Sequence, residues 1–238
     1  MQRNGTHFRD ITRLETLCFI VVERFKEERE CEIRTCPDLK GKETQHNQEH
    51  FIHGIALCWN CQGLGIDLTV RRLKEINRKY LPDVICLSET KQRNDYVRDT
   101  CCELGFSNFV MVPSMGLSGG LVVLWKPSVH ISVSFNSPNL VDCYVQSNEV
   151  GFNLSFVYGH PNPSHRNNLW ERLERLAVNR NGQPWFILGD FNELLGNHEK
   201  IGGRIRPEAS FRHLRQMSPS ADGIEPTRIM TYEIIIDS

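Results

Sequence analysis

The chain has 238 residues, of which 39% are hydrophobic and 24% charged, and its formal net charge is −1. This composition is typical of a globular protein, and the longest early apolar run, Leu17 to Val22, is far shorter than the roughly 20 residues of a membrane span. We therefore predict an intracellular protein without a secretory signal, a transmembrane segment or a membrane partner. The near-neutral charge neither favours nor excludes nucleic acid.

The first 53 residues differ in pattern from the rest of the chain. Residues 11–29 are compatible with one amphipathic helix, and residues 30–53 are polar and rich in glutamate, glutamine and histidine. Because such a composition buries little apolar surface, we predict that residues 1–53 form a poorly ordered N-terminal extension.

From Ile55 onward, short apolar runs alternate with segments of helical periodicity. The predicted elements are a strand from Ile55 to Trp59, a helix from about Asp67 to Tyr80, a strand from Val84 to Leu87 and a helix from about Asn94 to Leu104. Pro82 and Gly105 are the stop signals of the two helices.

Five apolar runs separated by Pro, Gly, Ser and Asn then predict a meander of strands. They are Phe109 to Val112, Gly120 to Trp125, Val129 to Phe135, Leu140 to Gln146 and Phe152 to Tyr158. A helix carrying Leu169, Trp170 and Leu173, a strand from Trp185 and a helix from Glu208 to Met217 follow. The predicted fold is α/β, a two-sheet β-sandwich flanked by helices.

The segment from Trp185 to Asn192 is an apolar run that ends at Gly189 and then presents Asp190 and Asn192. Because side chains alternate along a strand, these two polar groups are expected on the same side. The carboxyl end of a strand is where α/β proteins place ligands, although an Asp-Asn turn accounts for the same residues.

Other predicted strands also end in isolated polar groups. Asn60 and Gln62 follow the first, Glu89 follows the second, and Tyr158 ends the last of the five consecutive runs. Each residue alone has a simpler explanation: Glu89 as a solvated carboxylate, Tyr158 as an aromatic residue at the rim, and Asn60 as a turn residue. If the strand ends lie together with the end of the Trp185 strand, the rim offers carboxylates, carboxamides and a phenol, which suit Mg²⁺ and a phosphate.

The nine cysteines include Cys58 and Cys61, a Cys-x-x-Cys pair that is compatible with a redox pair or half of a zinc site. No second pair with suitable spacing follows. We therefore favour reduced, structural thiols.

Four segments, taken in order, resemble the endonuclease/exonuclease/phosphatase superfamily of magnesium-dependent phosphodiesterases over about residues 55–217. They are Trp59-Asn60-Cys61-Gln62-Gly63, Leu87-Ser88-Glu89-Thr90-Lys91, Val157-Tyr158-Gly159 and Gly189-Asp190-Phe191-Asn192. Finer features are similar to the endonuclease domains of plant LINE-type, non-LTR retrotransposons. They are Cys58 to Gly65, Tyr158 to Pro161, Asn168-Leu169-Trp170, and Glu199-Lys200 followed by Gly202-Gly203.

The resemblance implies a DNase I-like fold that uses Mg²⁺ or Mn²⁺ and acts on the phosphate backbone of DNA, in the nucleus. It implies that Glu89 is the principal metal-binding carboxylate, with Asn60 and Asp190 also in the metal shell. Asp190 would orient or deprotonate the attacking water, Asn192 would steady the phosphate, and Tyr158 would hydrogen-bond it. No protein partner is implied.

One departure from the family pattern concerns a Ser-Asp-His segment, whose histidine contacts the scissile phosphate in the family. The chain has no such tripeptide, and the pattern stops after Met217. We therefore expect a partial domain over residues 54–217, with its last strands missing by C-terminal truncation, and a divergent tail over residues 218–238. Three hypotheses remain open: a DNA endonuclease, an inactive retroelement remnant that at most binds nucleic acid, and a phosphomonoesterase.

Overall fold

The computed structural model describes residues 17–24, 31–34, 52–116, 118–147, 150–180, 183–199, 204–217 and 228–231. The strands are β1 (Leu17–Arg24), β2 (Cys31–Arg34), β3 (Ile52–Asn60), β4 (Val84–Ser88), β5 (Asn108–Met115), β6 (Ser118–Trp125), β7 (His130–Ser137), β8 (Leu140–Ser147), β9 (Val150–Tyr158), β10 (Trp185–Asp190) and β11 (Arg228–Thr231). The helices are α1 (Asp67–Tyr80), α2 (Asn94–Glu103), α3 (Asn167–Arg180) and α4 (Arg212–Met217), with short 3₁₀ turns η2 (Pro163–His165), η3 (Asn197–Glu199) and η4 (Glu208–Phe211).

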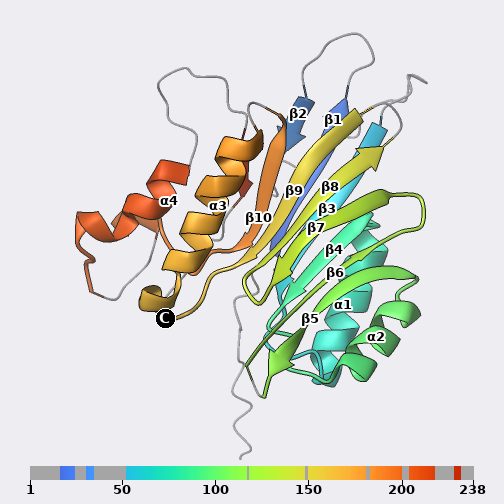
Figure 1. The fold of residues 1–238 in the computed structure, drawn as a ribbon. Coiled ribbons are helices and arrows are strands. Elements are labelled where there is room, and N and C mark those ends of the chain that lie inside the picture. The colour runs from blue at the N-terminus through green and yellow to red at the C-terminus, as the bar shows by residue number, and fades with distance from the viewer. Residues whose placement is uncertain are drawn as a thin grey trace, which may run out of the picture.

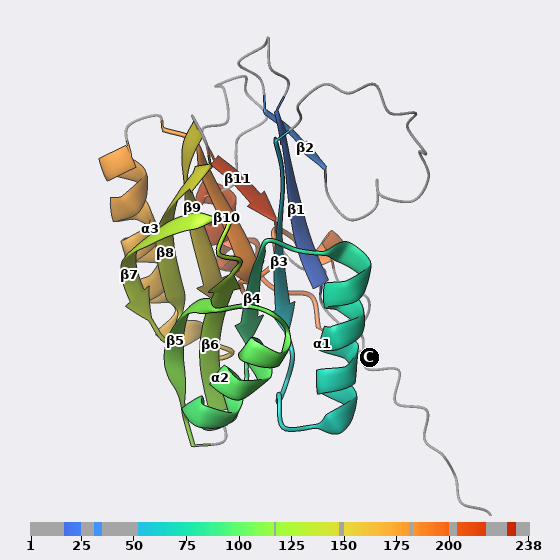
Figure 2. The same cartoon turned by 90° about the vertical axis from the view of Figure 1, so that its right-hand side faces the viewer.

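The strands form two sheets that pack face to face between two layers of helices (Figures 1 and 2). The first sheet has the order β2-β1-β3-β4-β6-β5 and the second β11-β10-β9-β8-β7. One apolar cluster lies between the sheets, one joins the first sheet to α1 and α2, and one joins the second sheet to α3 and α4. The predicted α/β fold of two sheets flanked by helices is confirmed.

The strands next to the centre of each sheet are apolar on both faces, as expected for strands covered on both sides. Every residue of β4 and of β10 is buried. In β3, alternation directs Leu57 and Trp59 toward α1 and α2, and Ala56 and Cys58 toward the second sheet. None of the described helices is long and apolar enough to cross a bilayer.

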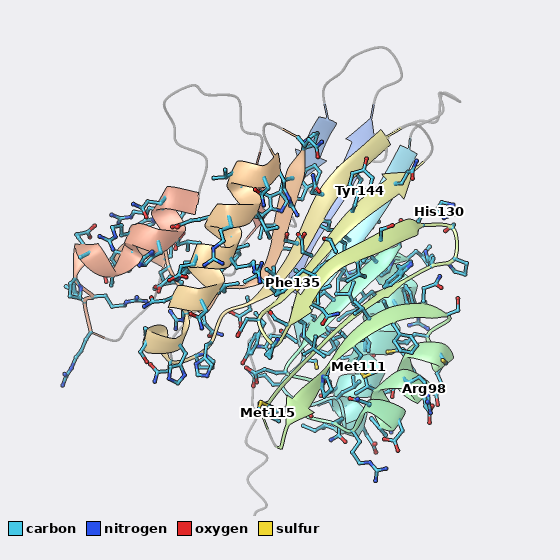
Figure 3. The ribbon with its side chains drawn as sticks, in the orientation of Figure 1. Arg98, Met111, Met115, His130, Phe135 and Tyr144 are labelled. Carbon is cyan, nitrogen blue, oxygen red and sulfur yellow. The ribbon has the colours of Figure 1, made fainter. Side chains whose placement is uncertain are left out.

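The prediction of a single five-stranded meander is wrong in its connectivity. β5 and β6 are an antiparallel pair in the first sheet, whereas β7, β8 and β9 form an antiparallel meander in the second. Apolar alternation identifies a strand but not its partner, so the crossover between β6 and β7 left no signal in the sequence. Figure 3 shows Phe135, on β7, close to α3, where the Arg172 guanidinium lies 4.1 Å from the ring centroid.

The N-terminal segment contributes strands rather than the predicted helix. Within residues 11–29, Leu17–Arg24 forms β1, which pairs antiparallel with β3 from Leu17↔Trp59 to Arg24↔Ile52. Its β-branched and aromatic residues favour a strand, and pairing covers the edge of β3. The predicted poorly ordered extension otherwise falls on residues 1–16, 25–30 and 35–51, outside the described residues. In the predicted tail, 228–231 form β11, parallel to β10, and the rest is not described.

Two glycines allow β9 and β10 to approach each other beside the rim. Gly189 has φ +143°, and a Cβ there would collide with the Val157 carbonyl oxygen, while a Cβ at Gly159 would collide with the Phe191 carbonyl oxygen. A larger residue at either position must therefore separate the two strand ends.

We expect Gly189→Ala to lower the free energy of unfolding by about 3 kcal/mol or more, because overpacking adds to the unfavourable φ. Urea denaturation measures this change. Gly105→Ala is the control, because Gly105 also has a positive φ but a Cβ added there would meet no atom within 4 Å; it should cost only about 1 kcal/mol. Equal losses for the two variants would contradict the close-approach explanation.

Candidate active site

The polar strand ends meet at one rim of the sandwich. β3 and β4 are parallel and pair Asn60 with Ser88, which precedes Glu89, while β9 and β10 are parallel and pair Tyr158 with Asp190. The two pairs belong to different sheets, and the Asn60 Nδ2 atom joins them by donating a hydrogen bond to Asp190 Oδ2 at 2.9 Å. The predicted convergence of the four strand ends is therefore present.

Glu89 is the centre of the hydrogen-bond network at this rim. Its Oε1 atom accepts from the Tyr158 hydroxyl at 2.7 Å and from Asn60 Nδ2 at 3.2 Å. Its Oε2 atom lies 2.5 Å from Lys91 Nζ. Asn60 thus donates to both carboxylates, and it is the group that holds Glu89 and Asp190 at one site.

Asn192 combines a turn with a contact at the site. Its backbone N–H donates to Asp190 Oδ1 at 2.8 Å, which is the Asp-Asn turn considered from the sequence. Its side-chain Nδ2 donates to the Gly159 carbonyl at 2.7 Å and lies 3.4 Å from Asp190 Oδ2. The turn and the site are therefore the same structure, and the backbone φ of Asn192, +49°, is held by these bonds.

The two carboxylates have pKa values shifted in opposite directions. For Asp190, burial raises the pKa, and hydrogen bonds from Asn60 and Asn192 offset only part of that effect. For Glu89, burial also acts to raise the pKa, but Lys91, Tyr158 and Asn60 together hold it below its usual value. A pair of carboxyl groups separated in this way is suited to different tasks, a permanent anion and a proton acceptor.

A sequence model of the Endonuclease/Exonuclease/phosphatase family matches residues 57–228, more than half of the chain. The chain belongs to this family. No curated protein matches it. The family consists of hydrolases that include nucleases and phosphatases, so the prediction of a hydrolase is confirmed in this general form.

Solved structures of other proteins are similar to this chain. The AP endonuclease LMAP from Leishmania major is 16% identical with a TM-score of 0.51, and the match covers 67% of this chain and 64% of LMAP. The catalytic domain of Xenopus laevis APE2 is 18% identical with a TM-score of 0.47, covering 71% and 68%. The endonuclease domain of TRAS1, a telomere-specific non-LTR retrotransposon, is 14% identical with a TM-score of 0.42, covering 58% and 59%. This chain spans less than two thirds of LMAP and of the TRAS1 domain, and at this identity the likeness to LMAP shows the DNase I-like fold alone.

Lys91 is a residue of this site to which the sequence analysis assigned no role. It follows Glu89 by two residues, and positive φ angles of +54° at Glu89 and +50° at Lys91 bring the ammonium back onto the carboxylate. Lys91 belongs to the segment Leu87 to Lys91, which carries the family resemblance. Its contact with Glu89 was not predictable, because a turn through two non-glycine residues of positive φ is uncommon and is not evident from local sequence.

Gln62 and the Cys-x-x-Cys pair lie at the margin of the family site. The Gln62 side chain is exposed, and its backbone N–H, rather than its amide, contacts the site by donating to Asn60 Oδ1 at 3.2 Å. Cys58 belongs to the cluster between the sheets, whereas Cys61 packs on the opposite face of β3. Burial raises the pKa of Cys61 to about 12, and its thiol donates to the Ser88 carbonyl. The two thiols thus occupy separate parts of the core.

The raised pKa of Asp190 predicts a pH dependence for any reaction in which this carboxylate accepts a proton. The rate should fall as the pH drops through the pKa of Asp190, and this fall should lie above the usual range for aspartate because burial raises that pKa. The stability of the fold responds with the opposite sign: it falls as the pH rises from the ordinary aspartate pKa through the raised one, because ionisation of the buried Asp190 carboxyl is unfavourable.

A pH–rate profile of kcat/KM measures the midpoint of this fall. In Asn60→Ala, loss of the hydrogen bond that lowers the Asp190 pKa should move the midpoint to higher pH. An unchanged midpoint would show that Asp190 is not the titrating group.

Proposed function

We propose that this chain hydrolyses phosphodiester bonds of DNA with the help of Mg²⁺, a role that Mn²⁺ can also fill. The observation that supports the proposal most strongly is the Asn60 amide, which holds the ionised Glu89 and the buried Asp190 at one rim, with the Tyr158 hydroxyl beside them. Within one hydrogen-bond network, this arrangement offers an anion that can bind a cation, a proton acceptor, and a hydroxyl that can donate a hydrogen bond to a phosphate.

The donor set fits a hard divalent cation. Glu89 and Asp190 would supply carboxylate oxygens, and Mg²⁺ is commonly held by one or two carboxylates with water and phosphate oxygens in the remaining positions. Asn60 would add its carbonyl oxygen once its amide is turned over, because its Nδ2 atom faces both carboxylates in this structure. The Lys91 ammonium lies 2.5 Å from Glu89 Oε2, so the Glu89 carboxylate already stabilises a positive charge at this position. A bound ion there would supply neutralisation of the charge that develops on the phosphate.

The remaining steps follow from the side chains of the chain itself. Asp190, which is buried and basic, accepts a proton from the attacking water, and Asn60 fixes the orientation of its carboxylate. Burial and the neighbouring Glu89 raise the pKa of Tyr158, so its hydroxyl stays protonated, and a bound phosphate oxygen would accept the hydrogen bond that it donates to Glu89 in this structure. Asn192 presents a second amide donor beside Asp190. No covalent intermediate with the protein is needed.

We propose DNA as the substrate, and a retrotransposon origin of plant LINE type, because the segments Cys58 to Gly65 and Tyr158 to Pro161 have that character. Action on DNA would place the protein in the nucleus, and we propose no protein partner. The 238 residues include no Ser-Asp-His tripeptide. We therefore expect a turnover lower than that of an enzyme in which a histidine also contacts the phosphate.

Nicking of supercoiled plasmid by the purified protein tests the proposal. The wild type should nick with Mg²⁺ and not with EDTA, and Glu89→Ala should abolish nicking. Glu103→Ala is the matched control, because Glu103 is an exposed carboxylate on α2 that contacts only Lys74 among the described ion pairs. Equal activity of wild type and Glu89→Ala would reject catalysis at this site.

Two further assays separate the competing functions. Salt-sensitive DNA binding without nicking would assign the chain to nucleic-acid binding only. Release of inorganic phosphate from monoesters, without nicking of plasmid, would assign it to phosphomonoester hydrolysis on the same fold.

A further inference from the structure

Arg166, between η2 and α3, is buried and uses three of its donor groups on the loops beside the site. Its Nε donates to the His160 carbonyl at 2.5 Å and its Nη2 to the Pro161 carbonyl at 2.8 Å. Its Nη1 donates to Glu193 Oε2 at 2.7 Å. The rigid guanidinium therefore joins the loop that follows β9 to the residue that follows Asn192.

Glu193 is buried and carries the opposite charge. Its second oxygen, Oε1, lies 2.5 Å from Arg206 Nη2 and accepts the Leu194 backbone N–H at 3.2 Å. A buried ion pair is a weak source of stability, because desolvation of the two charges offsets their attraction. The Arg166–Glu193 pair is therefore poorly explained by stability alone, and its position suggests another role.

The two loops that the pair joins carry the polar groups of the site. Tyr158 ends β9, Asp190 ends β10, and the loops after them exchange two hydrogen bonds. The Gly159 N–H donates to the Asp190 carbonyl at 2.7 Å, and Asn192 Nδ2 donates to the Gly159 carbonyl at 2.7 Å. Arg166 contacts the carbonyls of His160 and Pro161, which follow Gly159, and the side chain of Glu193, which follows Asn192. It therefore adjoins the contact between the two loops.

We propose that Arg166 and Glu193 are positioning residues that fix Asn192 and Asp190 relative to Tyr158. The proposal rests on the proposed function, since the geometry it sets is the geometry of phosphodiester hydrolysis. Displacement of a reacting group by about 1 Å costs on the order of a hundredfold in rate, so loss of the pair lowers kcat. Neither residue hydrogen-bonds a side chain of the rim, so binding of DNA changes little.

The chain contains a second buried ion pair that serves as a matched control. Arg180 at the end of α3 contacts Asp142 on β8, and both are buried. The Arg180 guanidinium lies 4.2 Å from the ring centroid of Trp185, the first residue of β10, whereas Asp190 is the last. At about 3.3 Å per residue, Trp185 lies roughly 16 Å from the rim along β10. Asp142 pairs with Ser155 and so lies about 10 Å from the rim along β9.

Steady-state cleavage of a fluorescent DNA duplex with Mg²⁺ compares three variants with the wild type. Arg166→Met should lower kcat about a hundredfold with KM changed less than about threefold, and Arg166→Lys should recover part of kcat. Arg180→Met should lower the melting temperature about as much as Arg166→Met does, but its kcat should stay within about twofold of wild type. If the Arg166→Met variant does not fold, the double variant Arg166→Met/Glu193→Gln, which lacks both buried charges, is used in its place.

Hydrogen exchange supplies a readout that does not depend on activity. Loss of Arg166 should speed exchange of the Gly159 and Asn192 amides, both bonded to Asp190, and Arg180→Met should leave them protected. Unchanged protection, or a kcat that falls no more than in Arg180→Met, would overturn the positioning role. Faster exchange in a chain whose wild type cleaves no DNA would reject the proposed function and leave the coupling of the two loops supported.

Discussion

Asp190→Asn is expected to lower kcat for Mg²⁺-dependent cleavage of DNA by about a thousandfold, because it removes the proton acceptor. An asparagine has nearly the shape of the aspartate and can still accept the Asn192 N–H through its carbonyl, while its NH2 group loses the hydrogen bond that Asp190 accepts from Asn60. The loss should therefore appear in kcat, with the fold and the affinity for DNA retained. Single-turnover nicking at saturating Mg²⁺ measures the chemical step directly.

Asp142→Asn is the control for this substitution. Asp142 is also a buried aspartate in the second sheet, but it contacts Arg180, Ser134 and Ser155 rather than the rim. Its loss should destabilise the protein, since it leaves Arg180 buried without its carboxylate, and kcat should stay within about twofold of wild type. Retention of a tenth or more of the wild-type kcat by Asp190→Asn would assign the proton to another acceptor.

The positions of the site residues were predictable because each follows an apolar run, and a strand end is a local feature. Parallel pairing of β3 with β4 and of β9 with β10 then brings Asn60, Glu89, Tyr158 and Asp190 together. How they contact each other was not predictable. The Asn60 amide bridges two sheets, which depends on how the sheets pack, and the contact from Lys91 depends on backbone angles that local sequence does not reveal.

The fold was predicted where strands are apolar on both faces, as in β4 and β10, or where helices have one apolar stripe, as in α1 and α3. The fold was not predicted where a short apolar run is compatible with either a helix or a strand. Leu17 to Val22 is such a run, and only pairing with β3 decides that it is a strand. The assignment of β5 and β6 to one sheet and β7 to the other likewise depends on tertiary pairing.

Glu89→Gln is expected to weaken binding of Mn²⁺ by about a hundredfold or more, since the charged ligand is lost while the side chain keeps its size. Mn²⁺ is a spectroscopic substitute for Mg²⁺, and electron paramagnetic resonance measures its free concentration without any need for activity. The Tyr158 hydroxyl and Asn60 amide can still hydrogen-bond the new amide carbonyl. The effect should therefore come from the lost charge rather than from a collapsed site.

Lys91→Met gives a second test with the opposite sign. The Lys91 ammonium lies against Glu89 Oε2 and competes with a metal ion for that oxygen, so its removal should tighten binding of Mn²⁺. Glu103→Gln, on exposed α2, should leave the affinity unchanged. If Glu89→Gln binds Mn²⁺ as the wild type does, the metal lies elsewhere. If Lys91→Met weakens binding instead, Lys91 orients the carboxylate for the ion, and the competition between the two cations is rejected.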